Sequence, residues 1–165
     1  MEKITNCEWL PMTISLNDYG GDFEKYFDYL YDVFKRDLLH NQPLYKGLRV
    51  GARKYPLVDN KHEGFYHLTH RDYEKTGFSC RQFDTRRSER LHWIKPVIEN
   101  YGCTKNCCSR IKVWTEKKRV HILFEDERYV VVLDNRKTYY VVVTAYYIDQ
   151  THTLNKLLKR YNYYK

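Results

Sequence analysis

The sequence predicts an α+β domain in which N-terminal helices pack on a four-stranded antiparallel sheet, followed by a C-terminal helix. Two observations lead to this fold class. Apolar residues recur at helical spacing through residues 22–40, and four β-branched runs follow one another closely after residue 110. Because strands joined by tight turns pair with their chain neighbours, the four runs indicate an antiparallel meander. Helices followed by strands are typical of the α+β class.

The chain length sets the domain organisation. The 165 residues are enough for one buried core, so we expect a single domain with an N-terminal elaboration at 1–60 and a functional core at 61–165. No run approaches the roughly 18–20 apolar residues that span a bilayer. The segment MEKITNCEWL lacks the apolar centre of a signal peptide. We therefore expect a cytoplasmic protein without a membrane partner, whose five cysteines are thiols.

The N-terminal region contains one strong helix signal. Residues Asp22–His40 place aromatic and aliphatic side chains on one face and charged ones on the other. Gly20-Gly21 before this segment and Asn41-Gln42-Pro43 after it are start and stop signals. The elements that follow are shorter: strands at Leu48–Arg53 and Gly64–Thr69, then a loop at Arg71–Asp84.

A second helix is expected at Thr85–Asn100, with Pro96 weakening its last turn. Its apolar face also carries Arg87, and Arg90 lies beside that face. An arginine directed at a core is costly unless it is paired or faces a ligand. The two arginines are therefore either a phosphate clamp at the start of the helix or the partners of nearby carboxylates.

The sheet is expected to comprise IKVWTE, VHILFE, YVVVLD and the run Tyr139–Tyr147. Since side chains alternate along a strand, Thr144 and Tyr146 should share one face with Tyr140 and Val142. The two hydroxyl groups would then lie two residues apart near the end of a central strand.

A C-terminal helix is expected to begin after Thr151, which is a suitable N-cap. Leucines and one tyrosine recur at spacings of three and four, whereas basic residues occupy the other side. The apolar stripe comprises Leu154, Leu157, Leu158 and Tyr161, and the basic side comprises His152, Lys156 and Lys159. This helix is either an anion-binding surface or a solvated helix that covers the sheet.

The positive charge is concentrated in one segment. Residues 81–120 contain eleven Lys or Arg and four Asp or Glu, and so carry +7 of the net +8. A local positive field attracts phosphate-rich partners. Because no amphipathic helix with the flanks of a membrane binder is present, nucleic acid is the favoured partner.

His67 is the leading candidate for acid–base chemistry. It lies in FYHLTH, an apolar and aromatic segment that we interpret as a strand, and imidazole exchanges protons near neutral pH. A structural histidine is the alternative. His70 and His152 are further candidates.

The cysteine cluster GCTKNCCSR offers a weak metal signal. Cys103, Cys107 and Cys108 have the spacing C-x3-C-C, which lacks the separated ligand pairs of zinc ribbons and fingers. We therefore expect no metal and no cofactor, with zinc at these thiols as the alternative. The motifs of P-loop nucleotide binders, zincins, serine hydrolases and EF-hands do not occur.

Several short motifs occur together in a specific order. FYHLTH, RRSERLHWIKPVIEN, IKVW, YVVVTAYYID and HTLNKLLKRY follow one another between Trp9 and Tyr161. This order resembles the phage- and mobile-element-associated nucleases of the Barnase–EndoU–colicin–RelE (BECR) superfamily. Two features depart from the pattern: Tyr147 stands where a proline often follows T-A-Y, and GCTKNCCSR looks like an insertion.

The resemblance implies a metal-independent endoribonuclease, a hydrolase that in many members is a toxin. Its partners would be RNA and an antitoxin or immunity protein. The matching positions imply an acid–base role for His67, a phosphate clamp of Arg87 and Arg90, and orienting hydroxyls at Thr144 and Tyr146. The expected substrate-binding residues are His152, Lys156, Trp93 and Lys112. The alternative function is a non-catalytic nucleic-acid-binding module of a phage or mobile element.

Overall fold

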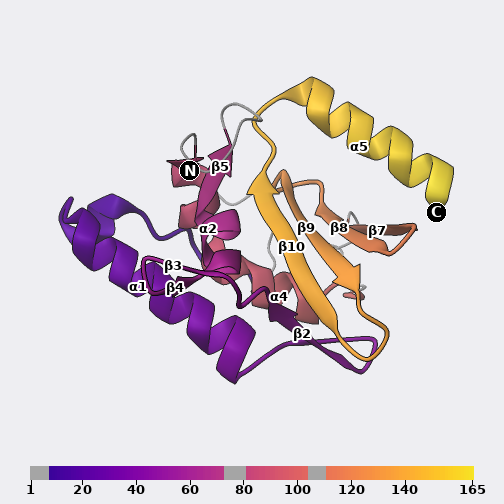
Figure 1. The fold of residues 1–165 in the computed structure, drawn as a ribbon. Coiled ribbons are helices and arrows are strands. Elements are labelled where there is room, and N and C mark those ends of the chain that lie inside the picture. The colour runs from indigo at the N-terminus through magenta and orange to yellow at the C-terminus, as the bar shows by residue number, and fades with distance from the viewer. Residues whose placement is uncertain (1–7, 73–80, 104–110) are drawn as a thin grey trace.

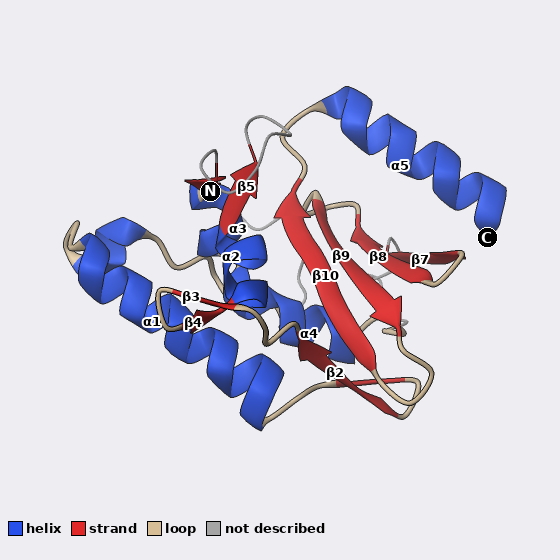
Figure 2. Cartoon of the chain, viewed as in Figure 1, coloured by secondary structure: helices blue, strands red, loops and turns tan. Residues whose placement is uncertain are grey.

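A computed structural model of the chain describes residues 8–72, 81–103 and 111–165. A curled, mixed β-sheet forms its centre, with most of the helices on one side and the C-terminal helix on the other (Figure 1). Figure 2 shows the same arrangement by secondary structure. The prediction of an α+β fold with a C-terminal helix is confirmed.

The sheet has six strands in the order β1-β2-β10-β9-β8-β7. Their bounds are β1 Leu44–Tyr45, β2 Leu48–Ala52, β7 Ile111–Glu116, β8 Arg119–Phe124, β9 Tyr129–Asn135 and β10 Tyr140–Tyr147. Strands β7 to β10 form the expected antiparallel meander. The prediction of a four-stranded, purely antiparallel sheet is wrong. Strand β2 adds to the meander by pairing in parallel with β10, and β1 pairs in turn with β2. Two short pairs lie outside this sheet: β3 Leu57–Val58 with β4 Lys61–His62, and β5 His70–Asp72 with β6 Arg81–Phe83.

The helices include the long N-terminal helix that the apolar periodicity predicts. Helix α1 spans Phe23–Lys35 and continues as the π-helical turn η2 at Arg36–His40. The other helical elements are η1 Leu16–Tyr19, α2 Glu63–Thr69, α3 Thr85–Glu89, η4 Leu91–Trp93, α4 Ile94–Glu99 and α5 Thr151–Tyr164.

Four local predictions are wrong. The segment expected as a loop at Arg71–Asp84 contains most of β5 at its start and β6 at its end, and these two strands pair with each other. The segment expected as a strand at 64–69 is helix α2, which ends at Thr69. The helix expected at 85–100 is broken at Arg90 (φ −118°, ψ 12°) into α3, η4 and α4. This break places Pro96 in the first turn of α4, where its missing N–H removes no helical hydrogen bond. The N-cap of α5 is Gln150 rather than Thr151, whose hydroxyl instead accepts a hydrogen bond from Arg128 at 2.9 Å.

The main core lies between one sheet face and the helices α1 and α4. Tyr26, Leu30 and Phe34 of α1 are completely buried. They belong to one cluster with Val131 of β9 and Ile98 of α4. Residues from the expected N-terminal elaboration and from the expected functional core therefore share a single hydrophobic cluster.

Helix α5 covers part of the other sheet face. Leu157 is buried, and Leu154, Leu158 and Tyr161 pack beside it, as the apolar stripe predicts. Arg160 forms two short contacts with Glu116 of β7, at 2.6 and 2.7 Å. The same carboxylate accepts a hydrogen bond from the indole of Trp114 at 2.9 Å. No helix in the described part of the chain has the length and apolar character needed to span a bilayer.

A β-bulge in β10 changes which residues share a face. Val142 lies opposite Leu133 of β9, but Thr144 lies opposite Val132, so Val143 is the extra residue. Tyr140 and Val142 consequently point into the main core, whereas Thr144 and Tyr146 belong to the face that carries α5. The expected pairing of Thr144 with Tyr146 holds, but the expectation that Tyr140 and Val142 share their face is wrong.

We predict that the stability of the fold decreases as the pH falls from 6.5 to 4. The imidazole of His121 is stacked on Trp114 at 4.8 Å, and its burial lowers its pKa from 6.5 to about 4. In this window the unfolded chain binds a proton that the folded chain does not. Unfolding therefore becomes easier, by about 1–3 kcal/mol across the window.

Urea unfolding at several pH values measures this dependence. His121→Phe keeps a ring on Trp114 but cannot titrate, so its unfolding free energy should change less over the same window. The hydrogen bond from Arg160, which is the main cause of the lowered Glu116 pKa, is kept in both proteins, and only the smaller effect of His121 on this carboxylate is lost in the variant. Equal slopes for the two proteins would contradict the prediction.

Candidate functional site

His67 lies in helix α2, and this places it beside a buried carboxylate. Residues at i and i+4 are neighbours on a helix surface. Glu63, whose side chain is 4% exposed, lies with Oε1 3.3 Å from Nε2 of His67, which is 38% exposed. A carboxylate at this nitrogen favours the tautomer that carries its proton there, which leaves Nδ1 as the proton acceptor. The pair has the arrangement of a base held in position by an acidic group.

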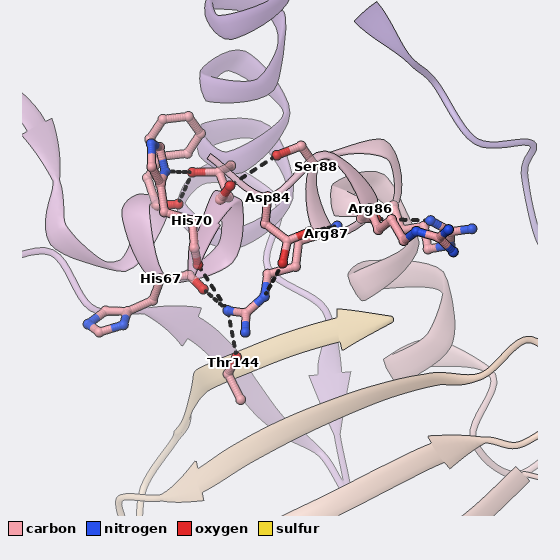
Figure 3. Close-up of polar contacts among 10 residues, drawn as sticks. His67, His70, Asp84, Arg86, Arg87, Ser88 and Thr144 are labelled. Atoms are coloured by element: carbon pink, nitrogen blue, oxygen red, sulfur yellow. Dashed lines mark hydrogen bonds and ion pairs between the residues drawn. The ribbon is translucent and has the colours of Figure 1, made fainter. Parts of the chain in front are cut away.

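Arg87 connects α3 to the C-terminal end of α2. Its Nη1 donates to the carbonyl oxygens of His67 at 2.9 Å and His70 at 3.1 Å (Figure 3). The carbonyl groups at the end of a helix attract a cation. Its Nε lies 3.3 Å from the carboxylate of Asp84, which also accepts from the Arg87 backbone as the N-cap of α3.

One terminal nitrogen of Arg87 is not used by these contacts. Within residues 8–72, 81–103 and 111–165, Nη2 donates no hydrogen bond, because the contacts of the side chain are made by Nη1 and Nε. Burial lowers the pKa of Arg87, but the ordinary pKa of arginine is so high that the group stays cationic at neutral pH. Arg87 can therefore hold the fold through Nη1 and Nε and offer Nη2 to an anion.

Arg90 does not join Arg87. Because the helix breaks at Arg90, its guanidinium lies over the rings of Tyr147 at 4.5 Å and Trp93 at 5.3 Å. Its Nη1 donates to the carbonyl oxygen of Arg86. The structure thus separates the two arginines that the sequence pattern places together.

Thr144 and Tyr146 both lie near Arg87. The Thr144 hydroxyl is 3.5 Å from Nη1 (Figure 3), and the guanidinium lies 5.5 Å from the centre of the Tyr146 ring. Burial raises the pKa of Tyr146, with Arg160 and Arg87 acting in the opposite direction. The Tyr146 hydroxyl therefore remains a hydrogen-bond donor at neutral pH.

A cavity of about 470 Å³ brings several of these groups together. His67, Arg87 and Tyr146 line it, and His70 and Arg71 add a second imidazole and a second guanidinium. The remaining lining residues are Tyr66, Asp84, Tyr147, Ile148, Asp149 and Thr153. Figure 3 shows the His67 ring directed away from the Arg87 guanidinium, so a ligand in contact with both would extend along the cavity.

Other candidate residues lie away from this cavity. His152 and Lys156 are exposed on α5, which contributes Thr153 instead. Trp93 is 3% exposed and packs edge-to-face on Tyr129 in the core. Lys112 forms an ion pair with Glu125 at 2.6 Å. Cys103 is half-buried, and Cys107 and Cys108 lie outside the described residues. The described residues contain no group of three His, Cys, Asp or Glu side chains that could hold a metal.

The sequence interpretation did not assign Glu63 and Arg71 to the site, and it named His70 only as a further candidate. The signal for Glu63 was its spacing of four from His67, which has meaning only on a helix. On a strand the two residues would be about 13 Å apart. His70 and Arg71 follow α2 directly and enter the cavity because β5 begins there.

The chain was also compared with known proteins. No protein-family model, no curated protein and no solved structure matches it. Any function must therefore be argued from the site itself.

We predict that Arg87→Met destabilises the fold by about 1–3 kcal/mol. The substitution leaves two carbonyl oxygens without their charged donor and the Asp84 carboxylate without its ion-pair partner. Chemical denaturation measures the change in the free energy of unfolding.

The control variant is Arg86→Met, because Arg86 is adjacent and exposed and only lies over the Tyr147 ring. It should cost less than about 1 kcal/mol. Equal losses for the two variants would show that Arg87 does not connect α2 to α3.

Proposed function

We propose that the protein is a metal-independent endoribonuclease. The observation that carries the proposal is the cavity of about 470 Å³ that is lined both by two histidines, His67 and His70, and by two arginines, Arg71 and Arg87. RNA can be cleaved without a metal when a base, an acid and a cationic group surround one phosphate. The resemblance to BECR nucleases supports the same activity, and the positive charge of the chain suits an RNA substrate.

The proposed reaction begins at the substrate's own ribose. The imidazole of His67 accepts the proton of the 2′-hydroxyl, and the 2′-oxygen attacks the adjacent phosphorus. Arg87, through Nη2, and Arg71 stabilise the charge on the phosphorane. The bond to the 5′-oxygen breaks as His70 donates a proton to it. The products are a 2′,3′-cyclic phosphate and a 5′-hydroxyl.

Two hydroxyl-bearing residues have supporting roles in this scheme. Tyr146 lines the cavity as a protonated donor and can bind a phosphate oxygen. Thr144 contacts Arg87 instead of lining the cavity, so its role is to position the guanidinium. An antitoxin or immunity protein as a further partner is proposed on the resemblance alone.

A second candidate function is a non-catalytic nucleic-acid-binding module. One observation favours it: Nη1 and Nε of Arg87 are engaged in holding α2, α3 and β10 together. A guanidinium with a structural role can bind phosphate without promoting cleavage. This function predicts salt-dependent retardation of RNA without any change in its length.

We predict that the purified protein cleaves total RNA in the presence of EDTA and that His67→Gln reduces the rate by about 10²–10⁴-fold. The loss follows because glutamine cannot accept the 2′-hydroxyl proton. Gel analysis gives the rate, and end-group analysis should identify 2′,3′-cyclic phosphates.

His152→Gln is the matched control, since His152 is exposed on α5 and does not line the cavity. Its rate should equal that of the wild type. Full activity of His67→Gln would exclude this mechanism, and retardation without cleavage by the wild type would favour the binding module.

We predict that Glu63→Gln lowers the cleavage rate by about tenfold or more. The amide keeps the shape of the side chain but removes the carboxylate that lies at Nε2 of His67 and orients the imidazole. The measurements are the steady-state cleavage rate and the free energy of unfolding. A lower rate that is matched by a loss of folding stability would indicate that Glu63 only supports the packing of α2.

A further inference from the structure

A second and larger cavity adjoins the candidate site. It has a volume of about 910 Å³, and His67 lines both cavities. Most of the remaining lining comes from β2, β8, β9 and β10 and from the segments next to them, and Gly64 of α2, together with Gln42, completes it. His67 therefore stands at the boundary between the two spaces.

Part of the second cavity is lined by one stretch of the sheet. Gly51 of β2 lies beside Val141 of β10, which pairs with Asp134 of β9, and Asp134 pairs with Arg119 of β8. Residues paired in this way point to the same face of a sheet. This is the face that α5 covers further along, where Leu157 packs on Val130 and Val132. The cavity therefore lies over the part of this sheet face that α5 does not cover. An extended polymer can lie along this uncovered part.

The charges around this cavity favour an anion. Arg53, Lys54 and Arg119 line it and are exposed. Asp134, the one lining carboxylate, is paired with Arg136 at 2.8 Å, so these two charges offset each other. Among the described residues, the side chains of Lys54 and Arg119 have no hydrogen-bond or ion-pair partner. Three cationic groups thus line one cavity of mixed polar and apolar surface, which suits a chain of phosphates and not a single small anion.

We propose that this second cavity binds the single-stranded RNA that flanks the cleaved phosphate; this inference rests on the proposed nuclease function. Lys54 and Arg119 would contact successive phosphates of a strand that passes His67 from the smaller cavity. Tyr139, which lines the cavity and is 46% exposed, offers a ring on which a base can stack. Because no donor set here is specific for one base, the subsite would bind by charge and stacking.

The test compares a long oligouridine with a dinucleotide. A 2′-O-methyl oligouridine cannot be cleaved through its 2′-oxygen, so fluorescence anisotropy gives its affinity directly. For Lys54→Gln/Arg119→Gln we expect about tenfold weaker binding, and a salt dependence whose slope falls by about 1.4, because two phosphate contacts are lost. Cleavage of the dinucleotide UpA should keep the wild-type kcat and KM, since it fills only the smaller cavity.

The charge-matched control is Arg49→Gln/Lys159→Gln, which removes two exposed cations that line neither cavity. It should bind the oligouridine as the wild type does, and Lys54→Arg/Arg119→Lys should retain most of the affinity. The subsite would be overturned if Lys54→Gln/Arg119→Gln and the control variant lost affinity equally, or if Lys54→Gln/Arg119→Gln kept its affinity. A loss of dinucleotide cleavage in Lys54→Gln/Arg119→Gln would also overturn it. If the protein cleaves neither substrate and only Lys54→Gln/Arg119→Gln loses affinity, the nuclease is refuted, and the second cavity is an RNA-binding surface without a cleavage site.

Discussion

The contacts of one guanidinium group hold the candidate site together. Arg87 joins the end of α2, the first turn of α3 and the strand β10 through hydrogen bonds to His67, His70 and Thr144 and an ion pair with Asp84. These segments are far apart in the chain, and the ends of α2 and α3 have few apolar residues of their own to pack. A partly buried cation that meets carbonyl oxygens and a carboxylate is retained, because removing it would leave several partly buried groups without a partner. The smaller cavity, which Arg87 lines, lies at this junction.

Much of the fold could be predicted because its signals are periodic. The helical period of residues 22–40, the β-branched runs of the meander and the leucine stripe of α5 each depend on burial of one face. The parallel pairing of β2 with β10 could not be predicted in this way. Leu48–Ala52 is a short strand whose partner lies about ninety residues further along the chain, and local patterns carry no information on such pairing.

The site was predicted less well because it depends on local irregularities. FYHLT is rich in aromatic residues and reads as a strand, but packing of Phe65 and Leu68 in the core selects a helix. The break at Arg90 and the bulge at Val143 each turn the following side chains to a different side. Four of the predicted site residues nevertheless lie close together at the C-terminal end of β10, because α2 and α3 both contact this strand. They are His67, Arg87, Thr144 and Tyr146. Residues assigned from the amphipathic pattern of α5 lie elsewhere, because a basic stripe on a helix is equally a solvated face.

The limited length of β2 has a consequence for the behaviour of the protein in solution. β2 pairs with β10 only from Tyr140 to Val142, and the rest of that edge lies against α2 and α3. An open strand edge is a template on which other chains can add, and proteins commonly prevent this by covering it. The two short helices therefore protect the molecule from edge-to-edge aggregation. Variants that loosen them should be examined for self-association as well as for lost activity.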